Sequence, residues 1–195
     1  MKKKSNWIRL AILTLIVPLL SGCGYNQLVE QDEAIAQQWA QVENSYQRRA
    51  DLIPNLVNTV KGYADFEKET LTGVIEARSK ATGINIDPSN LTPEAIQNFQ
   101  AAQNQLSGAL SRLMVVVERY PDLKANQNFL ELQAQLEGTE NRISFERKKF
   151  NDAVGKYNTS VRRFPRTIIA KMFGFDKKGY FEADSGAEKA PEVSF

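Results

Sequence analysis

Apolar residues recur at helical spacing along most of the chain and repeat with a period of seven, which is typical of helices that pack along one face. The first such stretch has these apolar positions: Leu28, Ile35, Trp39, Val42, Tyr46, Ile53, Leu56, Val60, Tyr63 and Val74. Because the register passes through Pro54 without a slip, we expect one long helix that is kinked there. Pro54 has no N–H, so the carbonyl of Ala50 loses its usual partner.

A second helix follows a break at Gly83 and Asp87-Pro88. Thr92 is its expected N-cap, and Pro121 ends it. Its apolar face contains Ile96, Phe99, Leu106, Leu110, Leu113 and Val117.

A third helix is expected from Asn126, a plausible cap, to the residue before Pro165. Its apolar positions are spaced by seven: Phe129, Leu136, Ile143, Phe150, Tyr157 and Phe164. The stretch RTIIAKMFGF, residues 166–175, predicts a short C-terminal helix that ends at Gly174. The polar residues 183–195 are typical of a disordered tail.

Three amphipathic helices with short loops predict an all-α, antiparallel bundle, which we place at residues 23–182. If residues of neighbouring helices are aligned by their rise from the connecting turns, the first helix extends about 24 residues, or roughly 36 Å, beyond its neighbours. This extension is either a stalk whose apolar stripe binds another protein or, if the chain folds back at Pro54, a fourth helix of the bundle.

The N-terminus resembles a bacterial lipoprotein signal. Three lysines precede a short apolar run at residues 10–20, and LSGC ends at Cys23, the only cysteine. The run is too short for a spanning helix. We therefore predict that residues 1–22 are removed and that lipid on Cys23 holds the protein to a membrane. Gly24 after the cysteine favours the outer membrane, by resemblance to Gram-negative lipoproteins.

Charge and composition narrow the function classes. Residues 1–22 hold four of the 25 basic residues and no acidic one, so the remainder has 21 basic and 23 acidic residues, a net charge of −2. That charge balance does not indicate the excess of basic residues that is typical of nucleic-acid-binding proteins. Histidine is absent, which removes the usual zinc sites and histidine-based nucleophile systems. No motif indicates a cofactor, and we expect a protein that is not an enzyme.

Polar residues interrupt the apolar faces at five positions: Arg49, Glu67, Gln103, Glu140 and Arg147. If the first two helices turn around near residue 86, Glu67, Gln103 and Glu140 lie at one level. Two buried carboxylates need a cation, for which Arg142 or Arg147 is expected. We interpret the set as a structural polar layer; the alternative is a carboxylate pair for proton transfer or for a divalent cation.

The stretch RRADLIPNL suggests a second polar cluster. Under the same height matching, Arg49 lies beside the turn YPDLKAN between the second and third helices. We expect a structural clasp there, or alternatively a site for a partner peptide. Its residues are Arg48, Arg49, Asp51, Pro54, Asn55, Tyr120 and Asp122.

The blocks RRADLIPNLV and YPDLKAN, with RRFPRTIIAKMFGF, resemble the LemA family of bacterial membrane-anchored helical proteins over residues 25–181. The resemblance implies a helical bundle, often four-helical, outside the cytoplasm. It also implies no established reaction, and partners in the envelope such as membrane proteins with a TPM domain.

We therefore expect a scaffold or adaptor that faces the periplasm or another extracytoplasmic space, with a second copy of the chain as an alternative partner. Membrane remodelling is a second hypothesis, for which residues 166–175 are the best candidate, although such a segment more often caps a core. A metal-dependent or acid-base enzyme that uses Glu67 and Glu140 is a third.

Overall fold

The computed structural model describes residues 2–63 and 68–182, with side chains from Gly24 onward. These residues form helices and connecting segments without a strand, in agreement with the predicted all-α class. The elements are α1 (Lys2–Lys61), α2 (Lys68–Gly83), the 3₁₀ helix η1 (Pro88–Asn90), α3 (Pro93–Val117), α4 (Pro121–Lys124), α5 (Gln127–Arg162) and α6 (Arg166–Phe173).

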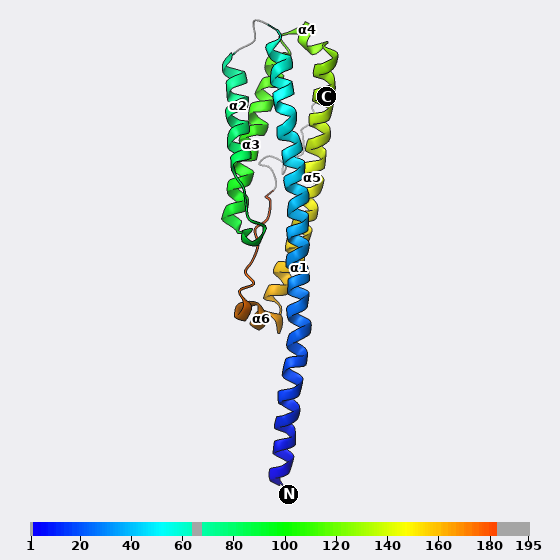
Figure 1. The fold of residues 1–195 in the computed structure, drawn as a ribbon, viewed down its shortest axis with the longest axis vertical. Helices are drawn as coiled ribbons and strands as arrows, with labels where there is room; N and C mark the ends of the chain where they lie inside the picture. The colour runs from blue at the N-terminus through cyan, green and yellow to red at the C-terminus, as the bar shows by residue number, and fades with distance from the viewer. Residues whose placement is uncertain (1, 64–67, 183–195) are drawn as a thin grey trace, which may run out of the picture.

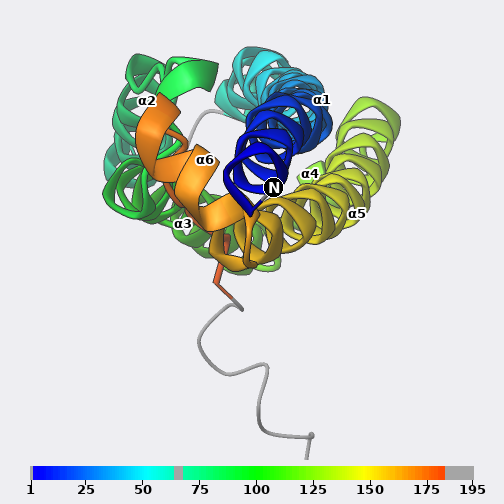
Figure 2. The same ribbon diagram turned by 90° about the horizontal axis from the view of Figure 1, so that it is seen from below.

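Four long helices run up and down along a common axis, and α1 extends below the others (Figure 1). The chain rises in α1, descends in α2, rises in α3, turns at α4 and descends in α5. Helix α1 packs chiefly on α5, and α2 packs on α3. Seen from below, α6 crosses the lower end of the bundle beside α1 (Figure 2).

The expected first helix is in fact two helices, since α1 ends at Lys61 and α2 begins at Lys68. The prediction of a single helix up to Gly83 was wrong. Apolar residues continue at helical spacing on both sides of the turn, at Val60, Tyr63 and Val74, so their periodicity does not reveal the reversal. A fourth bundle helix does exist, but it is α2, and the chain passes through Pro54 without folding back.

The apolar stripe at the start of α1 is part of the core and not a stalk. Leu28, Ile35, Trp39 and Val42 are each fully buried. They pack with side chains of α3 and α5 in one cluster. Helix α1 is thus a bundle helix from Leu28 upward.

The predicted helix ends agree with the structure. Thr92 Oγ1 accepts the N–H of Ala95 at 3.2 Å, and Asn126 Oδ1 accepts the N–H of Phe129 at 3.1 Å. Gly174 ends α6 with φ +74°, a left-handed conformation that glycine adopts without strain.

The buried apolar residues form two clusters, one above the other. The upper core is drawn from α1, α2, α3, α4 and α5 and includes Ile53, Leu56, Leu106, Leu113 and Phe129. The lower core centres on Trp39, Phe99, Phe150 and Phe181 and contains no residue of α2. Arg49 lies between the two along α1.

The segment after α6, residues 174–182, returns along the bundle and is held by side-chain amides. In each case the amide oxygen accepts a backbone N–H and the amide nitrogen donates to the carbonyl of the same residue, at 2.8–3.0 Å: Asn158 with Lys178, Asn151 with Phe181, and Gln100 with Glu182. This segment, which we name the strap, places Phe181 against Trp39 with ring centroids 6.0 Å apart. The expected disordered tail, residues 183–195, lies outside the described residues.

Candidate functional site

A buried arginine is the centre of the bundle's polar layer. Arg49 is 1% exposed, and its guanidinium donates to the Glu140 carboxylate, to Ser107 Oγ at 2.9 Å and to Gln103 Oε1 at 2.6 Å. Gln103 in turn donates to the carbonyl of Ala81 in α2, at 3.2 Å. The layer formed by Arg49, Gln103, Ser107 and Glu140 therefore connects all four bundle helices.

Because Glu140 remains 48% exposed, the Arg49–Glu140 ion pair is only half shielded from water. Removing Arg49 would leave Gln103 Oε1 without its donor inside the bundle and leave the half-exposed Glu140 carboxylate to water, which would lower the free energy of unfolding. The layer links residues of the four helices at one level.

The structure brings Gln103 and Glu140 of the predicted layer together, but the cation that joins them is neither Arg142 nor Arg147. Arg147 lies lower on α5, where it donates to the carbonyl of Glu182 at 2.7 Å and stacks over Phe181. Arg142 pairs with Glu146 and not with Glu140. Glu67 lies outside the described residues. The cation is Arg49, because α1 ends at Lys61 and its middle therefore lies at the level of Gln103.

The expected clasp at the top of the bundle does not form around RRADLIPNL. Arg49 points into the polar layer and not toward the turn at residues 120–126. Beside that turn lies Tyr63 instead, and Asn126 Nδ2 donates to Tyr63 Oη at 2.9 Å. Tyr120 packs against the upper core, and the nearby Asp122 is exposed in α4. The error follows from the same missed turn, which shifts α1 against the other helices.

The remaining residues of that stretch lie on the outside of α1. Arg48, Asp51, Pro54 and Asn55 are all exposed. Asp51 accepts a hydrogen bond from Gln47 at 2.7 Å, one helical turn earlier. None of these four residues reaches the turn at residues 120–126.

Pro54 has a partner on α2. Its missing N–H leaves the carbonyl of Ala50 free, as predicted, and Arg78 Nε donates to that carbonyl at 2.8 Å. The Pro54 position thus joins α1 to α2 through Arg78, a residue that helical periodicity alone does not single out.

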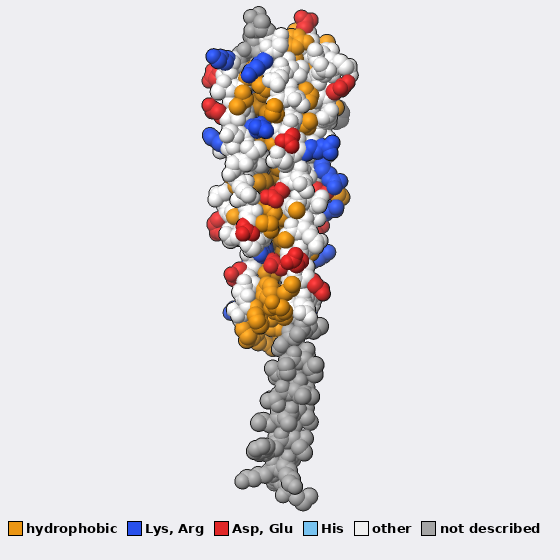
Figure 3. Space-filling view, in the orientation of Figure 1, with side chains coloured by type: hydrophobic (Ala, Val, Ile, Leu, Met, Phe, Trp, Pro, Cys, Tyr) orange, Lys and Arg blue, Asp and Glu red, His pale blue; other side chains and the backbone are white. Residues whose placement is uncertain are grey.

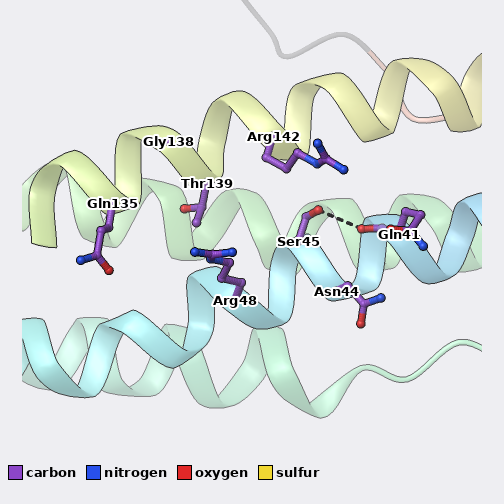
Figure 4. A pocket seen from close by; sticks show the side chains of 8 residues that line it. All are labelled: Gln41, Asn44, Ser45, Arg48, Gln135, Gly138, Thr139 and Arg142. Carbon is purple, nitrogen blue, oxygen red and sulfur yellow. Dashed lines mark hydrogen bonds between the residues drawn. The ribbon is translucent and has the colours of Figure 1, made fainter.

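An open groove of about 550 Å³ lies between α1 and α5, beside the polar layer. Figure 4 shows Arg48 and Thr139 pointing toward one another from the two helices. The lining residues are Gln41, Asn44, Ser45, Arg48, Gln135, Gly138, Thr139 and Arg142. We call this the α1/α5 groove.

The groove carries two arginines with different surroundings. Arg142 forms an ion pair with Glu146 at 2.7 Å, whereas within the described part of the chain Arg48 has no ion pair or hydrogen-bond partner. Since Thr139 and Ser45 are buried at the floor and Arg48 is exposed at the side, an incoming carboxylate can reach the Arg48 guanidinium without displacing a protein group.

Glu146 is a buried carboxylate that the sequence analysis missed. It is fully buried on α5 and accepts Gln38 Nε2 at 2.6 Å, in addition to its ion pair with Arg142. It occurs three residues after Ile143 and four before Phe150, which is the spacing of the apolar face. That spacing is the signal that could have identified it.

A second, smaller groove of about 270 Å³ lies on another side of α1, where Glu43 and Gln103 are among the lining residues. Burial raises the pKa of the Glu43 carboxyl above its ordinary value. Glu43 is on the opposite side of α1 from Arg48 and is not part of the α1/α5 groove.

Of the carboxylate pair in the enzyme hypothesis, Glu67 lies outside the described residues. The Glu140 carboxylate is bound by Arg49. Across the residues that the structure describes, no three Asp, Glu or Cys side chains lie close enough together to hold a metal ion. In the same part of the chain, no helix has an apolar stretch long enough to span a membrane.

Comparison with known proteins gives one family and several relatives. The sequence model of the LemA family matches residues 38–195. Magnetosome protein MamQ 2 of Paramagnetospirillum magneticum is 24% identical over 192 residues, covering 89% of this chain and 69% of the relative. Protein LemA of Metamycoplasma hominis is 23% identical over 158 residues, covering 81% and 68%.

Proposed function

The chain belongs to the LemA family, and we propose that it is a non-enzymatic, membrane-anchored adaptor that binds an acidic segment of an envelope protein in the α1/α5 groove. The family and relatives named as LemA and magnetosome proteins suggest a membrane-associated protein without catalytic activity. Membrane proteins with a TPM domain are the partner class that the family resemblance implies.

The groove is the observation that carries the proposal. It is open, it is lined by residues on two rigid helices, and Arg48 stands in it with no protein partner in the described residues. An exposed guanidinium on a bundle helix, without an ion pair in the described residues, suits recognition of a carboxylate. The polar layer just behind it keeps α1 and α5 in register, so the groove is preformed.

The proposed anchor places this groove at a useful height. If lipid is attached to Cys23, the groove residues of α1, from Gln41 to Arg48, lie about 30 Å farther along the helix. That distance lifts the binding surface above the lipid headgroups and toward proteins that stand in or beyond the membrane. The outer membrane remains the favoured location, because Gly24 and not aspartate follows Cys23.

Photocrosslinking in cells tests the adaptor role. A photoreactive amino acid at Gln135, in the groove, is expected to capture one predominant protein partner, and Arg48→Glu is expected to remove most of that product because it reverses the charge that attracts the partner. Both residues are exposed, so the fold should be unaffected.

The matched controls lie on α2. A photoreactive residue at Glu76 and the substitution Lys80→Glu are equally exposed but outside the groove. The photoreactive residue at Glu76 should give no such product. Lys80→Glu should leave the product captured from Gln135 unchanged. Equal capture from both positions, or a product that is insensitive to Arg48→Glu, would contradict the proposal.

A further inference from the structure

Exposed apolar side chains gather at the lower end of the bundle. In the space-filling view they form the broadest hydrophobic area on the visible face (Figure 3). Four of them belong to α6 and the turn before it: Phe164 (78% exposed), Met172 (71%), Phe173 (58%) and Ile168 (54%). We call these four residues the foot.

Helix α6 has one face in the core and another in solvent. Ala170 is buried and Ile169 packs against the lower core, as expected for a segment that caps a bundle. Ile168 and Met172, which are four residues apart and therefore on one helix face, point away from that core. Capping therefore explains only the buried face of α6, and the exposed apolar side chains on its other face are candidates for an interaction surface.

The foot lies where the chain meets its predicted anchor. A Cβ atom placed on Gly24 would lie 2.8 Å from Ile169 Cδ1, so α6 touches α1 one residue after Cys23. The apolar run at residues 10–20 leads into the same end of the bundle. Figure 2 shows the lower end of α1 beside α6, so a membrane that holds lipid on Cys23 would lie next to α6.

The chain segment that carries the foot is mostly basic. From Arg162 to Lys177 the chain carries five basic residues and one acidic residue, Asp176. Arg162, Arg163 and Lys171 are exposed beside the apolar side chains. Apolar groups flanked by cations are what an interface with anionic phospholipids requires, because the side chains enter the headgroup region and the cations remain at the phosphates.

We propose that the foot inserts into the interfacial layer of an anionic lipid bilayer, so that the bundle stands on the membrane on α6 in addition to its N-terminal anchor. The proposal rests on the membrane anchorage in the proposed function. It assigns α6 a lipid-binding role that orients the bundle and holds the α1/α5 groove at a set height.

Fluorescence quenching by brominated phospholipids tests this contact. The chain with its native membrane anchor and the substitution Phe173→Trp is reconstituted into phosphatidylcholine vesicles with and without phosphatidylglycerol. Phe145→Trp is the matched control, because Phe145 is an aromatic residue of similar exposure (51%) on α5. The native tryptophans are common to both variants, so the difference from the parent chain reports the introduced residue.

We expect the Phe173→Trp signal to shift to the blue and to be quenched several-fold more than that of Phe145→Trp, most strongly with phosphatidylglycerol. The additional changes Ile168→Asn and Met172→Asn should reduce the quenching, whereas Val115→Asn and Leu130→Asn, at exposed apolar positions elsewhere, should not.

Three results would overturn the proposal. If both variants are quenched equally and weakly although the chain floats with the vesicles, the anchor is supported and only the lipid contact of the foot is contradicted. A blue shift without quenching means that protein, such as a second copy of the chain, covers the foot. A chain that does not float with vesicles overturns both the anchorage and the foot.

Discussion

The upper and lower halves of the bundle achieve the same burial by different means. In the upper half α2 completes a four-helix arrangement, and the core is largely aliphatic. In the lower half no α2 residue reaches the core. Its place is taken by the segment from Ile84 to Leu91, by α6 and by the strap, and the aromatic rings of Trp39, Phe99, Phe150 and Phe181 fill the space.

The difference shows how a bundle can be closed without a fourth helix. An extended strap has no internal hydrogen bonds, so its backbone groups need partners on the helices. Asn151, Asn158 and Gln100 provide them in pairs. Gly179 allows the close approach, because a Cβ there would lie 2.7 Å from Pro93 Cα. The polar layer around Arg49 separates this construction from the regular bundle above it.

The largest effect is expected in the lower core. Trp39→Glu together with Val42→Glu buries two carboxylates where both parent side chains are fully buried, so the cooperative fold should be lost. Thermal melting followed by circular dichroism measures this. The control pair Gln37→Glu and Ala40→Glu, exposed on the same helix, should melt like the parent. A folded variant with only a changed oligomeric state would contradict the core assignment.

The polar layer between the halves should respond next. Arg49→Ala removes a fully buried side chain together with its hydrogen bonds to Glu140, Ser107 and Gln103, which is expected to cost about 3–5 kcal/mol in the free energy of unfolding. Arg49→Lys keeps the charge but not the forked donors, so its loss should be intermediate. Urea unfolding provides the measurement. The neighbouring Arg48→Ala is exposed and should change stability by less than about 0.5 kcal/mol.

The strap can be tested at its aromatic end. Phe181→Ala leaves a void beside Trp39 and should cost about 3 kcal/mol. Hydrogen exchange should then show faster exchange at residues 178–182 and in the lower halves of α3 and α5 before the upper half. Tyr180→Ala, an exposed aromatic residue one position earlier, is the control. Uniform destabilisation of both halves would mean that the strap is not a separate closing element.

The smallest effect concerns the α1–α2 contact that is specific to the upper half. Arg78→Ala removes the donor to the Ala50 carbonyl and should cost about 1–3 kcal/mol. With Pro54→Ala in the background, the N–H introduced at position 54 can bond that carbonyl, so the cost of Arg78→Ala should fall. A double-mutant cycle by urea unfolding measures the coupling. Equal costs in both backgrounds would show that Arg78 does not serve this carbonyl.

The positions and ends of most helices followed from the sequence, because these features depend on local chemistry. Thr92 and Asn126 cap, Gly174 stops α6, and Pro54 leaves a carbonyl free wherever the helix packs. Seven-residue spacing also identified most buried positions of α1, α3 and α5. Glu146 was missed because it occupies an apolar-face position as a charged residue, and only its contacts with Gln38 and Arg142 show that it is buried.

The partners of these residues depended on the tertiary structure. One turn after Lys61, invisible to helical periodicity, decides which residues share a level, and therefore that Arg49 and not Arg147 meets Gln103 and Glu140. It also decides that Arg78 reaches the Ala50 carbonyl. The sequence alone determined an all-helical chain of this family, since helical periodicity and the family blocks are properties of short stretches, and the lipoprotein signal stays a prediction. Only packing decided how the helices align, because alignment depends on where each long helix reverses.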